Sequence, residues 1–237
     1  VSLRRSTMHS DETFVLDGRT GSLLWHRTEG GAGHGCGGEL VAVHDHDGDG
    51  LEDALPFYPH VAFVMRGTDG KLLYQRVTHD LFSCPALYAK PVAADLLGNG
   101  KLQWLFCGTA YVWGLLDTAG RIIWRTGPQA GTPALLPGIG DADGDGRLEL
   151  LSPGHRRDAD KQSFQCLDAV TGQLKWQLPL PGGCYYGNNN AHPNASRFAA
   201  TADLDGDGRD ECIFDVGNQL HCVGAAPDGK SGEVRWK

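Results

Sequence analysis

The stretch LDAVTGQLKW, residues 167–176, decides the fold because variants of it recur along the chain. Each variant places a glycine shortly before an aromatic residue. The other copies are DGRTGSLLW (17–25), RGTDGKLLY (66–74), LDTAGRIIW (116–124) and PDGKSGEVRW (227–236). Successive aromatic residues are separated by 49, 50, 52 and 60 positions. A period near 50 residues indicates a chain built from structural repeats.

An acidic motif forms a second repeat in the gaps of the first. Its copies are DHDGDG from Asp45, DLLGNG from Asp95, DADGDG from Asp141 and DLDGDG from Asp203. Their starting points are separated by 50, 46 and 62 positions. Two independent patterns with a shared period argue against chance similarity.

Each period contains four short apolar segments with glycine-rich turns between them, which is typical of a β-propeller blade. The sequence therefore predicts an all-β propeller whose periodic aromatic residues pack the outer strand of one blade onto the next. An N-terminal arm is expected at 1–11 and a two-stranded half-blade at 12–26. Complete four-stranded blades are expected at 35–75, 89–125, 134–178 and 196–237. The half-blade lacks a partner in this chain. The chain is thus part of a larger propeller, is completed by another chain, or closes into a ring of its own.

Composition excludes several classes of protein. The 237 residues carry a formal net charge of −8, which argues against nucleic-acid binding because that requires basic patches. No apolar run reaches the ~18 residues of a membrane span, and no signal peptide is visible at the N-terminus. Among seven cysteines, Cys212 and Cys222 flank a predicted hairpin turn and either pair or remain buried thiols.

The acidic motifs have the oxygen-rich pattern of calcium loops. Carboxylates at positions 1, 3, 5 and 9 surround a turn with glycine at positions 4 and 6, and hard oxygen ligands of this kind suit Ca²⁺. Three loops predict three calcium sites, with ligands at Asp45, Asp47, Asp49 and Asp53; Asp141, Asp143, Asp145 and Glu149; and Asp203, Asp205, Asp207 and Glu211. The alternative is that these loops are simple Asp-Gly turns.

The loop that starts at Asp95 is degenerate. Positions 3, 5 and 9 hold Leu97, Asn99 and Gln103, so a single carboxylate remains. We expect this loop to keep its turn through hydrogen bonds and to bind no calcium.

The segments DHDGDGLEDAL (45–55), DADGDGRLELL (141–151) and DLDGDGRDECI (203–213) resemble the calcium loops of FG-GAP/VCBS-type propeller repeats. The segments LDGRTGSLLW (16–25) and LDAVTGQLKW are similar to the blade turns of quinoprotein-like propellers. Both occur together in the calcium-rich propellers of rhamnogalacturonan lyases and related secreted bacterial proteins. The resemblance implies an extracellular or periplasmic protein. It implies no catalytic residue, because these motifs belong to the scaffold.

Candidate ligand contacts lie in the longest segment that leads into a predicted inner strand, GGCYYGNNNAHPNAS at 182–196. Aromatic faces stack on sugar rings and amides pair with hydroxyl groups. The candidate binding residues are Tyr185, Tyr186, Asn188, Asn189, Asn190 and His192. This composition favours a non-enzymatic module that binds glycan or protein.

Two alternatives remain open. The first is a polysaccharide lyase acting on acidic polysaccharide, with Tyr186, His192 or His34 as the base that abstracts a proton. The shortage of basic residues in the segments that enter the blades argues against it. The second is a self-assembling structural protein, suggested by the unpaired half-blade, with a homo-oligomer as the expected state.

Overall fold

The computed structural model describes residues 2–6, 10–30, 39–58, 61–77, 92–107, 113–117, 119–126, 137–154, 163–179, 199–216 and 219–236. In these residues all assigned regular structure is β-strand, arranged in five antiparallel sheets. This confirms the all-β prediction.

The five sheets are numbered here in chain order. Sheet 1 contains β1 (Ser2–Ser6), β2 (Ser10–Leu16) and β3 (Leu23–Gly30). Sheet 2 contains β4 (Glu39–His44), β5 (Asp53–Tyr58), β6 (Val61–Met65) and β7 (Leu72–Val77). Sheet 3 contains β8 (Val92–Ala94), β9 (Gln103–Cys107), β10 (Trp113–Leu116) and β11 (Ile122–Arg125). Sheet 4 contains β12 (Gly138–Gly140), β13 (Glu149–Gly154), β14 (Ser163–Asp168) and β15 (Leu174–Pro179). Sheet 5 contains β16 (Ala199–Ala202), β17 (Glu211–Val216), β18 (Gln219–Ala225) and β19 (Gly232–Trp236).

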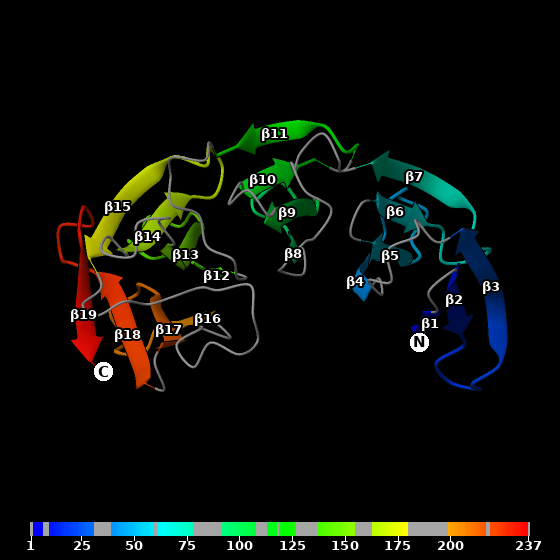
Figure 1. Ribbon diagram of the computed structural model, residues 1–237, viewed down its shortest axis with the longest axis horizontal. Coiled ribbons are helices and arrows are strands. Elements are labelled where there is room, and N and C mark those ends of the chain that lie inside the picture. The colour runs from blue at the N-terminus through cyan, green and yellow to red at the C-terminus, as the bar shows by residue number, and fades with distance from the viewer. Residues whose placement is uncertain are drawn as a thin grey trace.

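The sheets follow one another along an arc, as in a propeller (Figure 1). The first strand of each four-stranded sheet lies on the inner side of the arc and the last strand lies on the outer side. Sheets 1 and 5 occupy the two ends of the arc. Every sheet is an antiparallel meander in which sequential strands pair. Such a meander brings alternate connections to the same end of the sheet.

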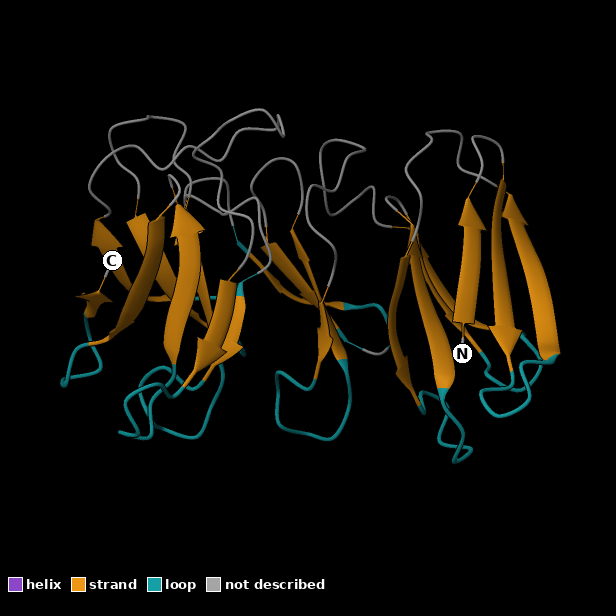
Figure 2. Cartoon of the chain, turned by 90° about the horizontal axis from the view of Figure 1, so that it is seen from below, coloured by secondary structure: helices purple, strands orange, loops and turns teal. Residues whose placement is uncertain are grey.

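The described loops gather at one end of the sheets (Figure 2). They are the acidic loops, which join the first and second strands, and the turns that join the last two strands. Residues 180–198 are flanked by β15 and β16. Strand β15 ends, and strand β16 begins, at the opposite end of the sheets from the acidic loops.

Sheet 1 has three strands where the sequence predicted a two-stranded half-blade. Strand β1 lies within the residues expected to form an arm, and it pairs with β2 from Ser2–Val15 to Ser6–Asp11. Its sequence, SLRRS, has one apolar residue and no alternation of apolar and polar positions. Such a segment lacks the usual strand signal, so only its pairing with β2 identifies it.

The core consists of apolar layers between neighbouring sheets. One layer joins sheets 4 and 5 and includes Phe164 and Phe214, both fully buried, whose ring centroids are 4.9 Å apart. Another joins sheets 3 and 4 through Leu105, Leu115 and Leu150. Burial of apolar area between successive sheets holds the arc together.

The periodic aromatic residues connect consecutive sheets, as predicted. The indole Nε1 of Trp25 in sheet 1 donates to the carbonyl oxygen of Gly67 in sheet 2 at 2.8 Å. Trp124 in sheet 3 donates in the same way to Ala169 in sheet 4 at 3.0 Å. These rings are only 8% exposed.

Cys166, Cys212 and Cys222 are buried free thiols. Cys212 lies opposite Val223 in the register of β17 and β18, so it does not face Cys222 directly. Burial raises the pKa of both thiols above the usual value. The structure thus favours the free-thiol alternative for this pair.

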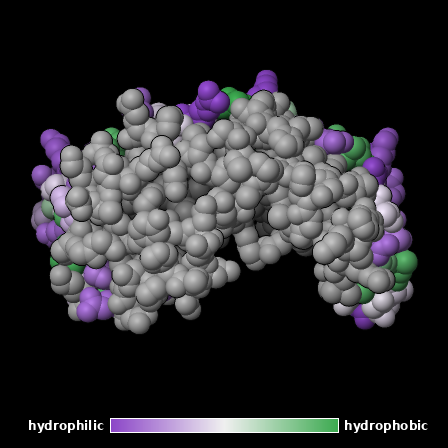
Figure 3. Space-filling model, in the orientation of Figure 1, coloured by the Kyte–Doolittle hydropathy of each residue, from purple (hydrophilic) through white to green (hydrophobic). Residues whose placement is uncertain are grey.

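The outer rim of the arc carries both hydrophilic and hydrophobic residues (Figure 3). The exposed apolar side chains of the outer strands are Leu23, Leu24, Ile122, Ile123, Leu174, Val234 and Trp236.

Candidate metal centres

Each acidic loop is closed by its first aspartate. In the first loop, Asp45 Oδ1 accepts the amide N–H of Gly48 at 2.7 Å, and Oδ2 accepts that of Gly50 at 2.9 Å. Both glycines have positive φ, 82° and 86°, which other residues rarely adopt. Asp141 and Asp203 receive equivalent amide hydrogen bonds in the third and fourth loops. The loop geometry therefore follows from the position of one carboxylate and two glycines.

Three loops bring carboxylates close enough to share one cation. The groups are Asp45, Asp47 and Asp53; Asp141, Asp143 and Glu149; and Asp203, Asp205 and Glu211. Within each group the candidate ligand atoms lie within 4.8 Å of one another. Oxygens that bind one Ca²⁺ at about 2.3–2.6 Å can be no more than about 5 Å apart. The spacing therefore fits a shared divalent cation.

The acid at position 9 anchors each group to the following strand. Asp53 and Glu149 are fully buried and Glu211 is 2% exposed. Each accepts a hydrogen bond from the amide at position 2, for example Leu204 N to Glu211 Oε2 at 3.0 Å. Burial raises the pKa of both Glu149 and Glu211, because a buried carboxylate loses its hydration. A nearby cation would offset that cost.

Two carboxylate oxygens in these groups are buried without a hydrogen-bond partner in the described part of the chain. They are Glu211 Oε1 in the fourth loop and Asp143 Oδ1 in the third. Buried polar atoms are normally satisfied, so each exception calls for an explanation. A bound cation would supply the missing partner, and the oxygen-only donor set is one that Ca²⁺ prefers.

The predicted ligands at position 5, Asp49, Asp145 and Asp207, are not members of these groups. The guanidinium group of Arg147 pairs with Asp145 at 2.9 Å, and Arg209 pairs with Asp207 through its Nε at 3.0 Å. Hydrogen bonds from these arginines lower the pKa of both aspartates. Asp49 accepts the amide of Leu51 at 2.9 Å. The sequence signal for the two ion pairs is the arginine at position 7.

The second loop keeps the same turn without a carboxylate group, as predicted. Asp95 accepts the amides of Asn99 at 2.9 Å and Gly100 at 2.7 Å. The side-chain NH₂ of Gln103, 2% exposed, donates to the Lys101 carbonyl at 2.6 Å and to Asn99 Oδ1 at 3.3 Å. The amide donor of Gln103 therefore stands at the position where the three acidic loops have a carboxylate.

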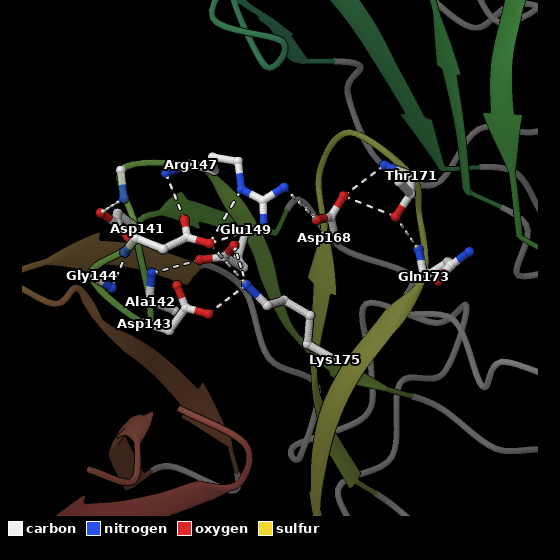
Figure 4. A network of polar contacts seen from close by, with 12 residues as sticks. Asp141, Ala142, Asp143, Gly144, Arg147, Glu149, Asp168, Thr171, Gln173 and Lys175 are labelled. Atoms are coloured by element: carbon white, nitrogen blue, oxygen red, sulfur yellow. Dashed lines mark hydrogen bonds and ion pairs between the residues drawn. The ribbon is translucent and has the colours of Figure 1, made fainter. Parts of the chain in front are cut away.

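The carboxylate group of the third loop contacts a positively charged side chain, Lys175 of β15 (Figure 4). Lys175 Nζ lies 2.5 Å from Asp143 Oδ2 and 2.9 Å from Glu149 Oε1. Burial alone would lower the pKa of Lys175, but its hydrogen bonds to the two carboxylates outweigh this and raise it. An open depression lined by Asp143, Asp145 and Lys175 gives solvent ions access to the group.

The equivalent cationic contacts are weaker in the other two acidic loops. Arg235 occupies the position before the periodic aromatic residue, like Lys175, and its Nη2 lies 3.8 Å from Glu211 Oε1. In the first loop, Arg66 Nε lies 3.5 Å from Asp47 Oδ2. The three groups thus share one donor set but differ in their internal positive charge.

The predicted ligand and catalytic residues lie outside the described residues. They are His34, Tyr185, Tyr186, Asn188, Asn189, Asn190 and His192.

No family model matches the chain, and no curated protein matches it in sequence. Solved structures share its fold. A rhamnogalacturonan lyase, YesW, has a TM-score of 0.59 at 16% identity, over 96% of this chain and 44% of its own length. Sqt1 from Saccharomyces cerevisiae has 0.57 at 10%, over 99% and 56%. The C-terminal domain of Pseudomonas aeruginosa PilY1 has 0.53 at 16%, over 73% and 39%.

These likenesses support a β-propeller fold. The chain spans about half the length of these proteins or less. No helix in the described part of the chain has the length and apolarity that crossing a membrane requires.

Proposed function

We propose that this chain is a calcium-stabilised propeller module that binds glycan or protein at the end of the sheets opposite its acidic loops. The observation that carries the calcium proposal is the buried oxygen Glu211 Oε1, which lacks a hydrogen-bond partner within an acidic group. Its residue is 2% exposed, so water has little access to this oxygen and a bound cation would be its better partner.

Calcium would neutralise each group and tie the loop to the strand that follows it. The residues that would hold it are Asp45, Asp47 and Asp53; Asp141, Asp143 and Glu149; and Asp203, Asp205 and Glu211. We expect the third loop to bind the ion more weakly, because Lys175 already pairs with two of its carboxylates. The second loop supports the proposal that the acidic loops hold calcium. There the Gln103 amide group donates hydrogen bonds within the loop, where a bound calcium ion would contact the carboxylates of the acidic loops.

The ligand-binding part of the proposal rests on the sequence of residues 182–196. Tyrosine and asparagine side chains suit sugar rings and their hydroxyl groups. A calcium-dependent scaffold fits an extracellular or periplasmic location, where calcium is abundant. The fold shared with a rhamnogalacturonan lyase is compatible with a role in carbohydrate recognition.

The test combines binding and turnover on the same samples. The protein in calcium is titrated with pectic, alginate and ulvan-type polysaccharides in a calorimeter, while ultraviolet absorbance monitors the release of unsaturated uronates. We expect saturable binding without a rise in absorbance. Tyr186→Ala should weaken polysaccharide binding. Lys101→Ala, which alters an exposed residue of the second loop, should leave it unchanged. A rise in absorbance would replace this proposal with a lyase, and absence of binding to every one of these polysaccharides would refute its glycan-binding part.

A further inference from the structure

One contact recurs at the four internal junctions of the arc. The aromatic residue of each repeat lies against the glycine that precedes the aromatic residue of the next repeat by four positions. The pairs are Trp25 with Gly70, Tyr74 with Gly120, Trp124 with Gly172 and Trp176 with Gly232. A Cβ atom on Gly70 would lie 2.7 Å from the Trp25 ring, and one on Gly172 would lie 2.5 Å from the Trp124 ring. Only glycine lets the ring approach so closely.

The contact buries the aromatic ring. Trp25 and Trp124 are 8% exposed and Trp176 is 4% exposed. At two junctions the indole N–H also donates to the carbonyl three residues before the glycine, Gly67 or Ala169. Ring packing and this hydrogen bond together make a directional junction between sheets.

The two ends of the arc each carry half of this contact. Trp236 on β19 has the position of the docked rings but is 45% exposed. Gly21, in the turn between β2 and β3, has the position of the docking glycines. A Cβ built on Gly21 would meet nothing within 4 Å in the described residues. Figure 1 places β19 at one end of the arc and the β2–β3 hairpin at the other.

We infer that Trp236 of one copy docks on the Gly21 turn of a second copy, so that the arcs join head to tail. The carbonyl oxygen of Gly18, three residues before Gly21, would accept the indole N–H, as Gly67 does within the chain. The occupant is a second copy because one chain presents both complementary halves at separate ends. The inference is independent of calcium binding and of the ligand.

A head-to-tail junction joins two different surfaces and either closes into a ring or extends as a chain of copies. In both cases it covers the sheet faces that an isolated arc leaves without a neighbouring sheet at its two ends.

The experiment measures association by sedimentation velocity from low to high micromolar concentration. We expect the wild type to associate. Trp236→Ala and Gly21→Asn should each weaken association at least ~30-fold, the factor for loss of a hot-spot residue. Asparagine tolerates positive φ, so Gly21→Asn adds bulk at the docking site with little backbone strain.

Two controls match these changes away from the ends. Ile122→Ala removes a 42% exposed apolar side chain from an internal sheet. Gly98→Asn alters another glycine of positive φ, 64°, with open space around it. Neither change should affect association, and circular dichroism melts should show that all four variants fold.

Mixing the two end variants tests the direction of the junction. The Trp236→Ala copy keeps an intact Gly21 turn, and the Gly21→Asn copy keeps Trp236. Each variant alone should be monomeric, and the mixture should form one-to-one dimers. A monomeric wild type, loss of association with Trp236→Ala only, or a mixture that stays monomeric would overturn the inference.

Discussion

Replacement of Lys175 by methionine should make the protein depend more on calcium. Without divalent ions the change leaves the fully buried Glu149 and the nearby Asp143 without the ammonium that contacts them at 2.9 and 2.5 Å. Breaking a buried ion pair from one side costs about 3–5 kcal/mol. Because the Lys175 side chain is 20% exposed, we expect the lower value of about 2–3 kcal/mol.

Calcium should reverse this loss. The methionine variant presents the third group without a competing cation, so the ion binds there more tightly than in the wild type. At a hundredfold excess over Kd, one filled site adds about 2.7 kcal/mol to the free energy of unfolding. For a chain of this size, each 1 kcal/mol shifts Tm by about 2–4 °C. The variant should therefore gain up to about 5–10 °C more than the wild type when calcium is added, with the full difference reached when the weaker wild-type site is still empty.

The assay is differential scanning calorimetry of both proteins in chelator and in calcium. Lys101→Met, which removes an exposed positive charge from the second loop, is the matched control and should behave like the wild type. Equal calcium shifts for the Lys175→Met variant and the wild type would refute the idea that lysine and calcium compete. Unchanged stability of the variant in chelator would show that the contact itself has little energetic value.

Three further changes test the scaffold. Gly172→Ala should destabilise the protein by about 2–4 kcal/mol in urea unfolding, because the new Cβ would lie 2.5 Å from the Trp124 ring; Gly98→Ala, with open space around it, should cost only about 1–2 kcal/mol of backbone strain. Equal losses would contradict the docking contact. Gln103→Glu removes the amide donor that completes the second loop and should cost about 1–3 kcal/mol without enlarging the calcium-dependent rise in Tm beyond that of the wild type. A larger calcium-dependent rise in this variant than in the wild type would show that one added acid is enough to make a fourth site. The hydrogen bond from Arg209 lowers the pKa of Asp207 below the usual 3.8. The contribution of this carboxylate to stability is therefore complete above pH 3.8 and is lost as the pH falls through the lowered pKa. In chelator, the Tm advantage of the wild type over Asp207→Asn should therefore shrink below about pH 3.8, and a difference that grows on acidification would reverse the sign of this account.

The fold was predictable because its signals are local and repeated. The glycines and first aspartate of each acidic loop encode the turn directly, as the amide hydrogen bonds to Asp45 show. The spacing of Trp25 and its counterparts encodes the stacking of sheets. Strand β1 carries no such signal, since its sequence, SLRRS, shows no alternation of apolar and polar residues and only its pairing with β2 identifies it.

The spacing of acids predicted that positions 1, 3 and 9 of each loop gather into one group, but it did not predict that position 5 is not a member of the group, nor where the positive charges lie. The role of Lys175 depends on its placement on β15 facing the third loop, which the spacing of acids cannot reveal. A signal existed in the repeat itself, because Lys175 and Arg235 replace the leucine or isoleucine found before the other periodic aromatic residues. Asp145 likewise forms an ion pair with Arg147 of the same loop and is not a member of the carboxylate group.

The most direct test of the calcium account is to count the ions bound by the chelator-treated wild type in a calorimetric titration. The account predicts three calcium ions per chain, two bound more tightly than the third, with the weak site strengthened by Lys175→Met. Magnesium should compete poorly, because it demands stricter geometry and retains its water. A titration that shows no calcium binding at all would contradict the central claim and leave the acidic loops as turns.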